Sequence, residues 1–202
     1  MKVLQIKVTK QLTNLIKTVG LSAAIAVVGY SQINSPAIAK IISQNPAETT
    51  KQQTQISQLE RVYLTEAAQT GMAELAMAKL ALEKSQNDKV KQYAQQMIKN
   101  HTPTNQELQQ LATQKGITLP TEMGMKYQAL ITQLSKLSGA NFDQAYINEA
   151  GINTHMEGLI LNSRLLQLGE DTELKAFAAK NIPLIESHLQ LLEKLFAAQN
   201  QQ

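Results

Sequence analysis

The stretch from Asp88 to Gly116, DKVKQYAQQMIKNHTPTNQELQQLATQKG, constrains the fold of this chain more than any other. Its apolar residues recur at spacings of three and four, which is typical of an amphipathic helix with one buried face. His101 continues that series and is therefore predicted to point inward. The other two histidines of the chain, His155 and His188, also fall on the apolar faces of later predicted helices. The sequence thus predicts a helical bundle with histidines in its core.

Composition supports an all-α domain. Ala, Leu, Gln, Lys and Glu dominate the chain and favour helices, whereas aromatic residues make up only 4% and the 202 residues include 9 glycines and 5 prolines. The sequence has no cysteine. This absence excludes disulfides, thiolate metal sites and cysteine nucleophiles.

The positive formal charge of +3 comes from the N-terminal segment. Four lysines precede residue 40 and no acidic residue does, so residues 40–202 hold 15 basic against 16 acidic residues. No basic stripe remains to neutralise phosphates, which argues against a nucleic-acid partner.

Residues 1–39 are predicted to be a secretory signal peptide. Lysines occupy the first part, an apolar run follows over residues 19–29, and Ala37 and Ala39 fit the small-residue rule for cleavage before Lys40. The alternative is a retained membrane anchor, but the apolar run is short for a span of about 20 residues. We therefore expect an exported protein of the periplasm or envelope, without a transmembrane span after cleavage.

The mature chain is predicted to start with a linker and continue as helices. Residues 40–56 are polar and rich in Gln and Thr, which indicates a disordered linker. The remaining domain, residues 57–198, shows helical periodicity broken by turn residues. The predicted helices cover roughly residues 57–85, 88–116, 121–137, 141–168 and 171–198.

The long helices are expected to pair into two hairpins. Asn87 and Asp88 provide a short turn and an N-cap between the first two, so these helices should be antiparallel. Gly169 closes the third long helix shortly before the fourth begins. The short helix then lies in a single long crossover. The predicted fold class is all-α, a ferritin-like four-helix bundle of two hairpins with a short crossover helix.

Proline and glycine residues set three local expectations. Pro103 removes one backbone hydrogen bond, so a kink is expected there, or a break with Thr102 as a new N-cap. Pro183 should bend the last helix. Gly116 is expected to end its helix as the C′ residue.

Four side chains are expected to converge inside the bundle. A rise of 1.5 Å per residue from the first hairpin turn places Glu74 and His101 within about one turn of the same level. His155 and His188 lie at a similar depth in the second hairpin. The predicted inward positions of the first helix, with Glu74 at their border, are Tyr63, Glu66, Thr70, Ala73, Met77 and Leu80.

Four segments, in order along residues 60–195, carry a family resemblance. They are AAQTGMAELAMAKLA (67–81), VKQYAQQMIKNHTPTNQELQQLATQKGITLP (90–120), FDQAYINEAGINTH (142–155) and LKAFAAKNIPLIESHL (174–189). On these segments the chain resembles the DUF4142 family of exported bacterial proteins, which are often labelled outer-membrane proteins and grouped with ferritin-like folds. The resemblance implies a periplasmic helical bundle of unassigned biochemistry. The family pattern has an acidic residue before the first histidine, whereas this chain has Asn100.

Three imidazoles and the Glu74 carboxylate at one level could bind a divalent transition-metal ion, namely one Zn, Cu or Fe ion. The ligands would be His101, His155, His188 and Glu74. The alternative is a set of neutral core histidines without metal, hydrogen-bonded to partners such as Tyr146, Thr70 or Asn181. Burial should lower the pKa of such histidines, unless Glu66 or Glu74 holds one of them charged.

A di-iron redox site is disfavoured. It requires Glu-x-x-His on two helices, but Ile98, Ile152 and Ile185 stand three residues before the histidines. The chain is therefore predicted not to be an enzyme. Two interpretations stay open: a metal-binding exported bundle that serves envelope stress tolerance, as the resemblance suggests, or a non-catalytic structural or interaction module of the envelope without metal. In either case any membrane association, or any envelope partner, would be peripheral.

Overall fold

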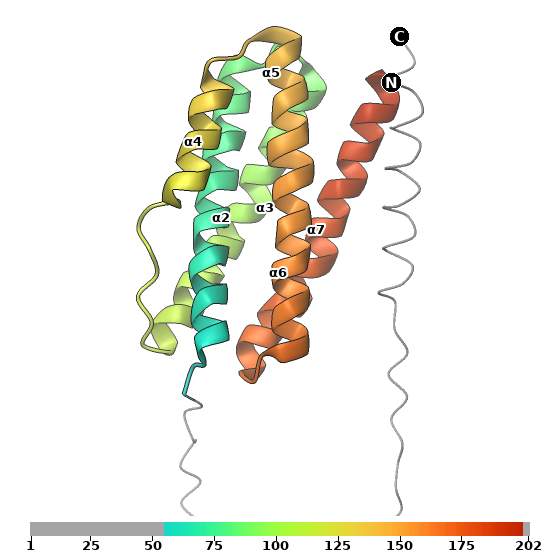
Figure 1. Ribbon diagram of the computed structural model, residues 1–202. Helices are drawn as coiled ribbons and strands as arrows, with labels where there is room; N and C mark the ends of the chain where they lie inside the picture. Colours follow the sequence, from blue (N-terminus) through green and yellow to red (C-terminus); the bar gives the residue numbers. More distant parts are fainter. Residues whose placement is uncertain (1–54, 200–202) are drawn as a thin grey trace, which may run out of the picture. The chain divides into compact units, whose positions relative to one another are not determined.

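The computed structural model describes residues 55–199, and all regular structure among them is helical, as the sequence predicted (Figure 1). The predicted signal peptide, and the predicted linker up to residue 54, lie outside the described residues. Ile56, which the sequence placed in the linker, is 9% exposed and packs in the core. The elements are α2 (Gln58–Lys84), α3 (Asp88–Gln114), α4 (Gly124–Ser135), α5 (Gly139–Tyr146), the π-helix η2 (Ile147–Asn153), α6 (Thr154–Leu168) and α7 (Thr172–Gln199).

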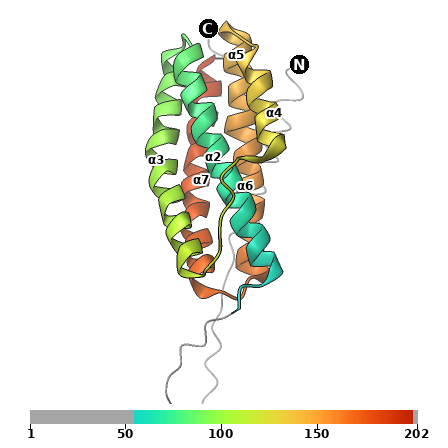
Figure 2. The same ribbon diagram turned by 90° about the vertical axis from the view of Figure 1, so that its left-hand side faces the viewer.

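The long helices pack as two hairpins. A three-residue turn joins α2 to α3, and a similarly short turn joins α6 to α7. The hairpins contact each other through α2 with α6 and through α3 with α7. α5, η2 and α6 follow one another without interruption and form one rod in Figure 1, while α4 lies on the outside against α2 (Figure 2).

Local sequence signals explain where the first two long helices begin and end. Ser57 caps α2 in a capping box with Glu60, and the Asn87 side chain accepts from the backbone N–H of Lys89 at the start of α3. At the end of α3, Gly116 has a φ of 67°. The Ile117 N–H donates to the Ala112 carbonyl, which completes a Schellman motif. The predicted role of Gly116 is thus confirmed.

Of the two alternatives expected at Pro103, a kink or a break with Thr102 as a new N-cap, the break is wrong, because α3 continues through this residue. Pro103 is exposed, so its ring needs no space inside the bundle, and one missing hydrogen bond does not end a helix that is packed on its other side. The neighbouring hydroxyls bond to carbonyls of the preceding turn. Thr102 donates to the Ile98 carbonyl at 2.7 Å and Thr104 to the Asn100 carbonyl at 3.0 Å. α7 likewise continues through Pro183.

Two apolar clusters fill the bundle and a polar layer separates them. One cluster includes Met77, Met97 and Ala150, towards the α2–α3 turn. The other includes Tyr63 and Phe177, towards the α6–α7 turn. Along each long helix, the residue that the sequence predicted as a metal ligand stands between residues of one cluster and residues of the other. The fold therefore places the four predicted ligands in the middle of the core.

The inward face predicted for α2 needs one correction, because Glu66 is exposed. The buried face of α2 is rotated away from it and includes Leu64, Ala68 and Ala78. α2 packs against α3, α6 and α4, and its buried face is the face that these three helices cover.

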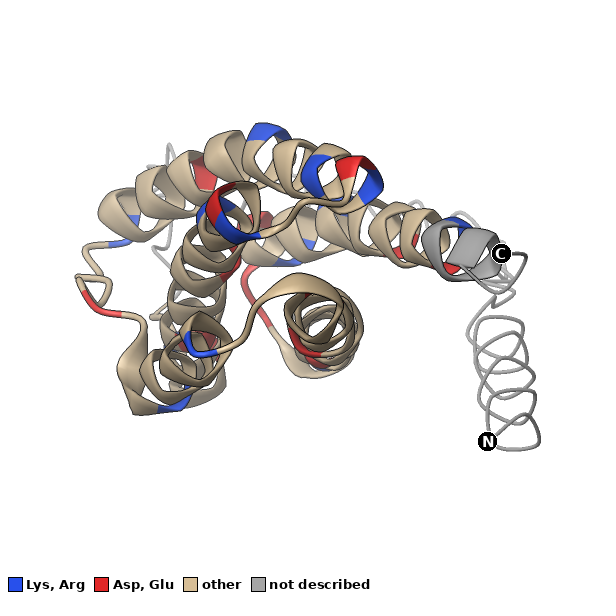
Figure 3. Ribbon diagram, turned by 90° about the horizontal axis from the view of Figure 1, so that it is seen from above, with Lys and Arg blue, Asp and Glu red and all other residues tan. Residues whose placement is uncertain are grey.

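The surface mixes both signs of charge. Blue positions (Lys, Arg) and red positions (Asp, Glu) are interspersed over the helices in Figure 3, and ion pairs such as Lys180–Glu107 and Lys126–Glu157 join neighbouring elements. Within the described residues, no helix combines the length and the apolar character that crossing a bilayer requires.

Candidate metal centre

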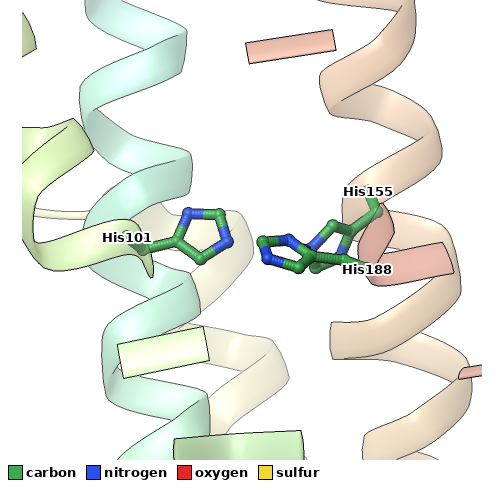
Figure 4. Close-up of side chains that lie close together, drawn as sticks. All are labelled: His101, His155 and His188. Atoms are coloured by element: carbon green, nitrogen blue, oxygen red, sulfur yellow. Dashed lines mark hydrogen bonds between the residues drawn. The ribbon is translucent and has the colours of Figure 1, made fainter. Parts of the chain in front are cut away.

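The polar layer consists of one side chain from each long helical segment. Glu74 comes from α2, His101 from α3, His155 from α6 and His188 from α7. Their exposed fractions are 9%, 5%, 1% and 1%. Figure 4 shows the His101 ring directed across the bundle at the rings of His155 and His188. The four residues that the sequence placed at one depth therefore lie together.

The three imidazoles are close enough to share an ion. One nitrogen of each ring lies within 4.8 Å of a nitrogen of the other two. The ring centroids are 5.7 Å apart for His101 and His155, and 5.1 Å apart for the two pairs that include His188. Imidazole nitrogens this close to one another form a group that could hold one metal ion.

Glu74 holds His101. Its Oε2 lies 2.9 Å from His101 Nδ1, and its Oε1 lies 3.9 Å from His155 Nε2. Burial alone would raise the pKa of Glu74, but the neighbouring imidazoles, His101 first, lower it below its usual value. Burial alone would lower the pKa of His101, and the Glu74 carboxylate raises it. The result is a buried carboxylate and imidazole pair that leaves His101 Nε2 facing the other rings.

The π-helix holds His155. His155 Nδ1 lies 3.1 Å from the Ala150 carbonyl, five residues earlier in the chain. A carbonyl can only accept, so this nitrogen carries the proton and Nε2 is left with a lone pair. The wider π turn presents carbonyls of η2 to residues five positions later, as the Thr154 hydroxyl also shows by donating to the Glu149 carbonyl. Single π turns of this kind are frequent at functional sites.

His188 is held between Asn100 and His155. Its Nε2 lies 2.8 Å from Asn100 Nδ2 and its Nδ1 lies 3.0 Å from His155 Nε2. An amide nitrogen can only donate, so His188 Nε2 accepts and His188 Nδ1 donates to His155. Hydrogen bonds thus run from Asn100 through His188 and His155 to the Ala150 carbonyl.

Two histidines of the centre are shifted towards the neutral form. Burial lowers the pKa of His155. Burial, followed by the repulsion of His155 and His101, lowers the pKa of His188 to about 3. The lower pKa expected from the sequence for buried histidines therefore holds for these two residues. The pKa of His101 is raised instead, because Glu74, and not Glu66, lies beside His101.

One ring nitrogen of the centre has no hydrogen-bond partner within the part of the chain that the structure describes. His101 Nε2 is buried and makes no hydrogen bond to any described residue. A cavity of about 60 Å³ adjoins His101 and Glu74 and is lined in part by the amides of Asn105 and Asn181. This volume holds at least one water molecule. A mostly apolar space with a few polar groups in its lining thus reaches the side of the centre that Glu74 occupies.

The histidine partners differ from those expected. Thr70 bonds to Tyr127, and the Asn181 side chain donates to the Phe177 carbonyl. The actual partners outside the four predicted residues are Asn100 and the Ala150 carbonyl. Neither partner could be identified from periodicity, because one contact depends on how α7 approaches α3 and the other on the π turn.

Comparison with known proteins identifies a family and a fold. Residues 45–195 match the model of a domain of unknown function, DUF4142. The structure resembles a DUF305 fragment from Deinococcus radiodurans with a TM-score of 0.63 at 14% identity, over 71% of this chain and 98% of that one. It also resembles a DUF305 protein from Streptomyces coelicolor, described as a candidate secreted protein, with a TM-score of 0.60 at 12% identity over 70% and 92%. Identities this low show a shared fold alone. No curated protein matches the chain.

Proposed function

The chain belongs to the DUF4142 family, and we propose that it is an exported, ferritin-like helical bundle that binds one divalent transition-metal ion in its core. The observation that carries the proposal is the set of three buried imidazoles, from three different helices, with nitrogens within 4.8 Å of one another. Buried polar side chains are costly unless they are paired or hold an ion. Zn, Cu and Fe are the ions that imidazole ligands suit.

The proposed ligands are His101 Nε2, His155 Nε2 and His188 Nδ1. Two ligands of a tetrahedral zinc ion are separated by about 3.3 Å, given metal–nitrogen distances of about 2.0–2.1 Å. His155 Nε2 and His188 Nδ1 are already 3.0 Å apart. Glu74 and the Ala150 carbonyl each hold the opposite nitrogen of a ligand ring, as acceptors commonly do at metal sites. Three imidazoles leave a fourth position, for Glu74 Oε1 or for water from the adjoining cavity.

The protein is proposed to work in the periplasm or envelope without catalytic activity. The signal-like N-terminus and the family support export, and a role in envelope stress tolerance follows from the resemblance alone. A nucleic-acid partner is disfavoured because basic and acidic residues are interspersed over the described helices. The Glu-x-x-His pairs of di-iron enzymes are missing from the sequence.

Elemental analysis of protein purified without a polyhistidine tag tests the proposal. We expect about one equivalent of metal in the wild type and a loss of that metal in His101→Ala. Tyr63→Phe is the matched control, because it alters a buried residue of the same bundle without touching a proposed ligand. The far-UV circular dichroism spectrum of each variant shows whether metal is lost because a ligand is missing or because the helices have unfolded. A folded wild type that retains no metal, and whose melting temperature does not respond to added zinc or to a chelator, would refute the proposal.

A specific observation favours the second candidate, a structural or interaction module without metal. The hydrogen bonds from Asn100 to Ala150 satisfy both ring nitrogens of His155 and of His188 without an ion. In that case a chelator leaves the melting temperature unchanged. If a metal is bound, chelation lowers the melting temperature, since binding to the native state stabilises it.

A further inference from the structure

We infer that Asn100 sets the metal affinity of the centre, because its amide holds His188 in the tautomer whose Nδ1 is protonated and therefore unable to bind an ion. The inference rests on the proposed metal site. Asn100 touches no proposed metal position itself. It lies beside His101 in sequence, but its side chain contacts the ring contributed by α7.

The Asn100 amide is also hydrogen-bonded to its neighbour on α3. Gln96 Nε2 donates to Asn100 Oδ1 at 3.1 Å, which leaves Asn100 Nδ2 to point at His188. This nitrogen is a donor only, so it occupies the lone pair of His188 Nε2 at 2.8 Å. The neutral imidazole must then carry its proton on Nδ1.

That proton lies in the position where the ion would bind. His188 Nδ1 faces His155 Nε2 at 3.0 Å, and the proton between them occupies the lone pair of His155 as well. The single N–H group of His188 thus prevents two of the three proposed ligand atoms, His188 Nδ1 and His155 Nε2, from binding the ion. Only His101 Nε2 lacks a partner among the described residues.

Metal binding therefore requires the proton of His188 to move to Nε2. In that state Asn100 must present Oδ1 instead of Nδ2, and Gln96 must present its own carbonyl to the Asn100 amide. Both amides have to rotate together and the hydrogen bond between His188 and His155 is lost, and the free-energy cost of these changes is subtracted from the affinity. An aspartate at position 100 removes this cost, because a carboxylate accepts from His188 Nε2–H and exposes Nδ1 to the ion, as Glu74 already does for His101.

The first test reads the tautomer directly and needs no metal. Long-range ¹H–¹⁵N correlation spectra of the chelator-treated protein distinguish protonated from unprotonated ring nitrogens of His188. We expect a protonated Nδ1 and an unprotonated Nε2 in the wild type, and a protonated Nε2 in Asn100→Asp. The inference is overturned if the wild type already carries the His188 proton on Nε2, or if the substitution leaves the tautomer unchanged.

The second test measures affinity by competition of zinc with a chromophoric chelator. Groups that orient metal ligands typically change the affinity by about 10–100-fold, so Asn100→Asp should bind zinc roughly tenfold more tightly than the wild type. Gln106→Glu is the matched control. It adds the same charge to α3 at an exposed position that does not line the cavity beside His101. This control should bind zinc within about twofold of the wild type.

The outcomes separate this inference from the proposed function. If the wild type binds one zinc ion and Asn100→Asp binds it no more tightly, the inference on Asn100 fails while the metal site stands. If Gln106→Glu gains as much affinity as Asn100→Asp, added charge explains the effect and the inference fails. If neither the wild type nor Asn100→Asp binds zinc, the proposed function fails, whatever tautomer His188 has.

Discussion

Replacement of Glu60 by glutamine should destabilise the bundle in a pH-dependent way. The Glu60 carboxylate is 1% exposed and joins the start of α2 to the turn between α6 and α7. Its Oε1 accepts from the backbone N–H groups of Glu170 at 2.8 Å and Asp171 at 2.6 Å. Its Oε2 accepts from the Ser57 N–H and hydroxyl, each at 2.8 Å. Glutamine has the same shape, but its amide NH2 group must face one of these two pairs of donors and cannot accept from them.

The pKa of Glu60 gives the magnitude. Burial alone would raise it, but the hydrogen bonds from Asp171, Ser57 and Glu170 together lower it from 4.5 to about 2. Because the folded pKa is below the unfolded one, the carboxylate stabilises the fold above pH 4.5. That stabilisation disappears as the pH falls towards 2. A shift of this size corresponds to roughly 3 kcal/mol at neutral pH.

Urea denaturation of the wild type and Glu60→Gln at several pH values measures this difference. At pH 7 the variant should unfold with a free energy lower by about 2–3 kcal/mol, and the gap should shrink steadily between about pH 4.5 and the acid limit of the assay. Glu66→Gln, an exposed change on the same helix, should stay within about 0.5 kcal/mol of the wild type. A gap that is absent at pH 7, or that does not shrink in acid, would refute the reasoning.

Three further outcomes are expected. Tyr63→Phe should lower the free energy of unfolding by about 1–3 kcal/mol, because the Tyr63 hydroxyl donates to buried Asn162 Oδ1 at 2.9 Å. An unchanged midpoint in urea denaturation would contradict this. Gly151→Ala should lower the melting temperature by an amount equivalent to about 1–3 kcal/mol, since the added Cβ would lie 2.7 Å from a methyl carbon of buried Leu192. An unchanged or raised melting temperature would contradict this and show that the core adapts. N-terminal sequencing of the exported protein should read from Lys40, and a chain that still begins at Met1 would contradict cleavage of a signal peptide.

The sequence predicted the helices and the depth of the site residues because both follow from fixed helical geometry. Apolar spacing identifies a helix, and a constant rise per residue places Glu74 and His101 at the same level from their shared turn. The Schellman end at Gly116 also followed from one residue, since glycine adopts a positive φ without strain. The break at Thr102 failed because packing of the whole helix outweighs the loss of one hydrogen bond at Pro103.

The contacts that tune the site could not be predicted, because they depend on packing between helices. The π turn of η2 forms where Gly151 meets Leu192 of α7 at a distance that leaves no space for a side chain. Asn100 departs from the family pattern already in the sequence. Its contact with His188, 88 residues away, arises only when α3 and α7 lie together. From the sequence alone, either Glu66 or Glu74 could be the carboxylate near a histidine, and the rotation of α2 in the bundle selects Glu74.

The X-ray absorption spectrum of the protein loaded with one equivalent of zinc tests the central claim most directly. The account predicts a four-coordinate ion with about three imidazole nitrogens at about 2.0–2.1 Å and one oxygen ligand. The same spectrum of His101→Ala should lose one imidazole or show no bound ion. A wild-type spectrum with one imidazole or none, typical of zinc held loosely at surface carboxylates, would contradict a metal centre built from His101, His155 and His188.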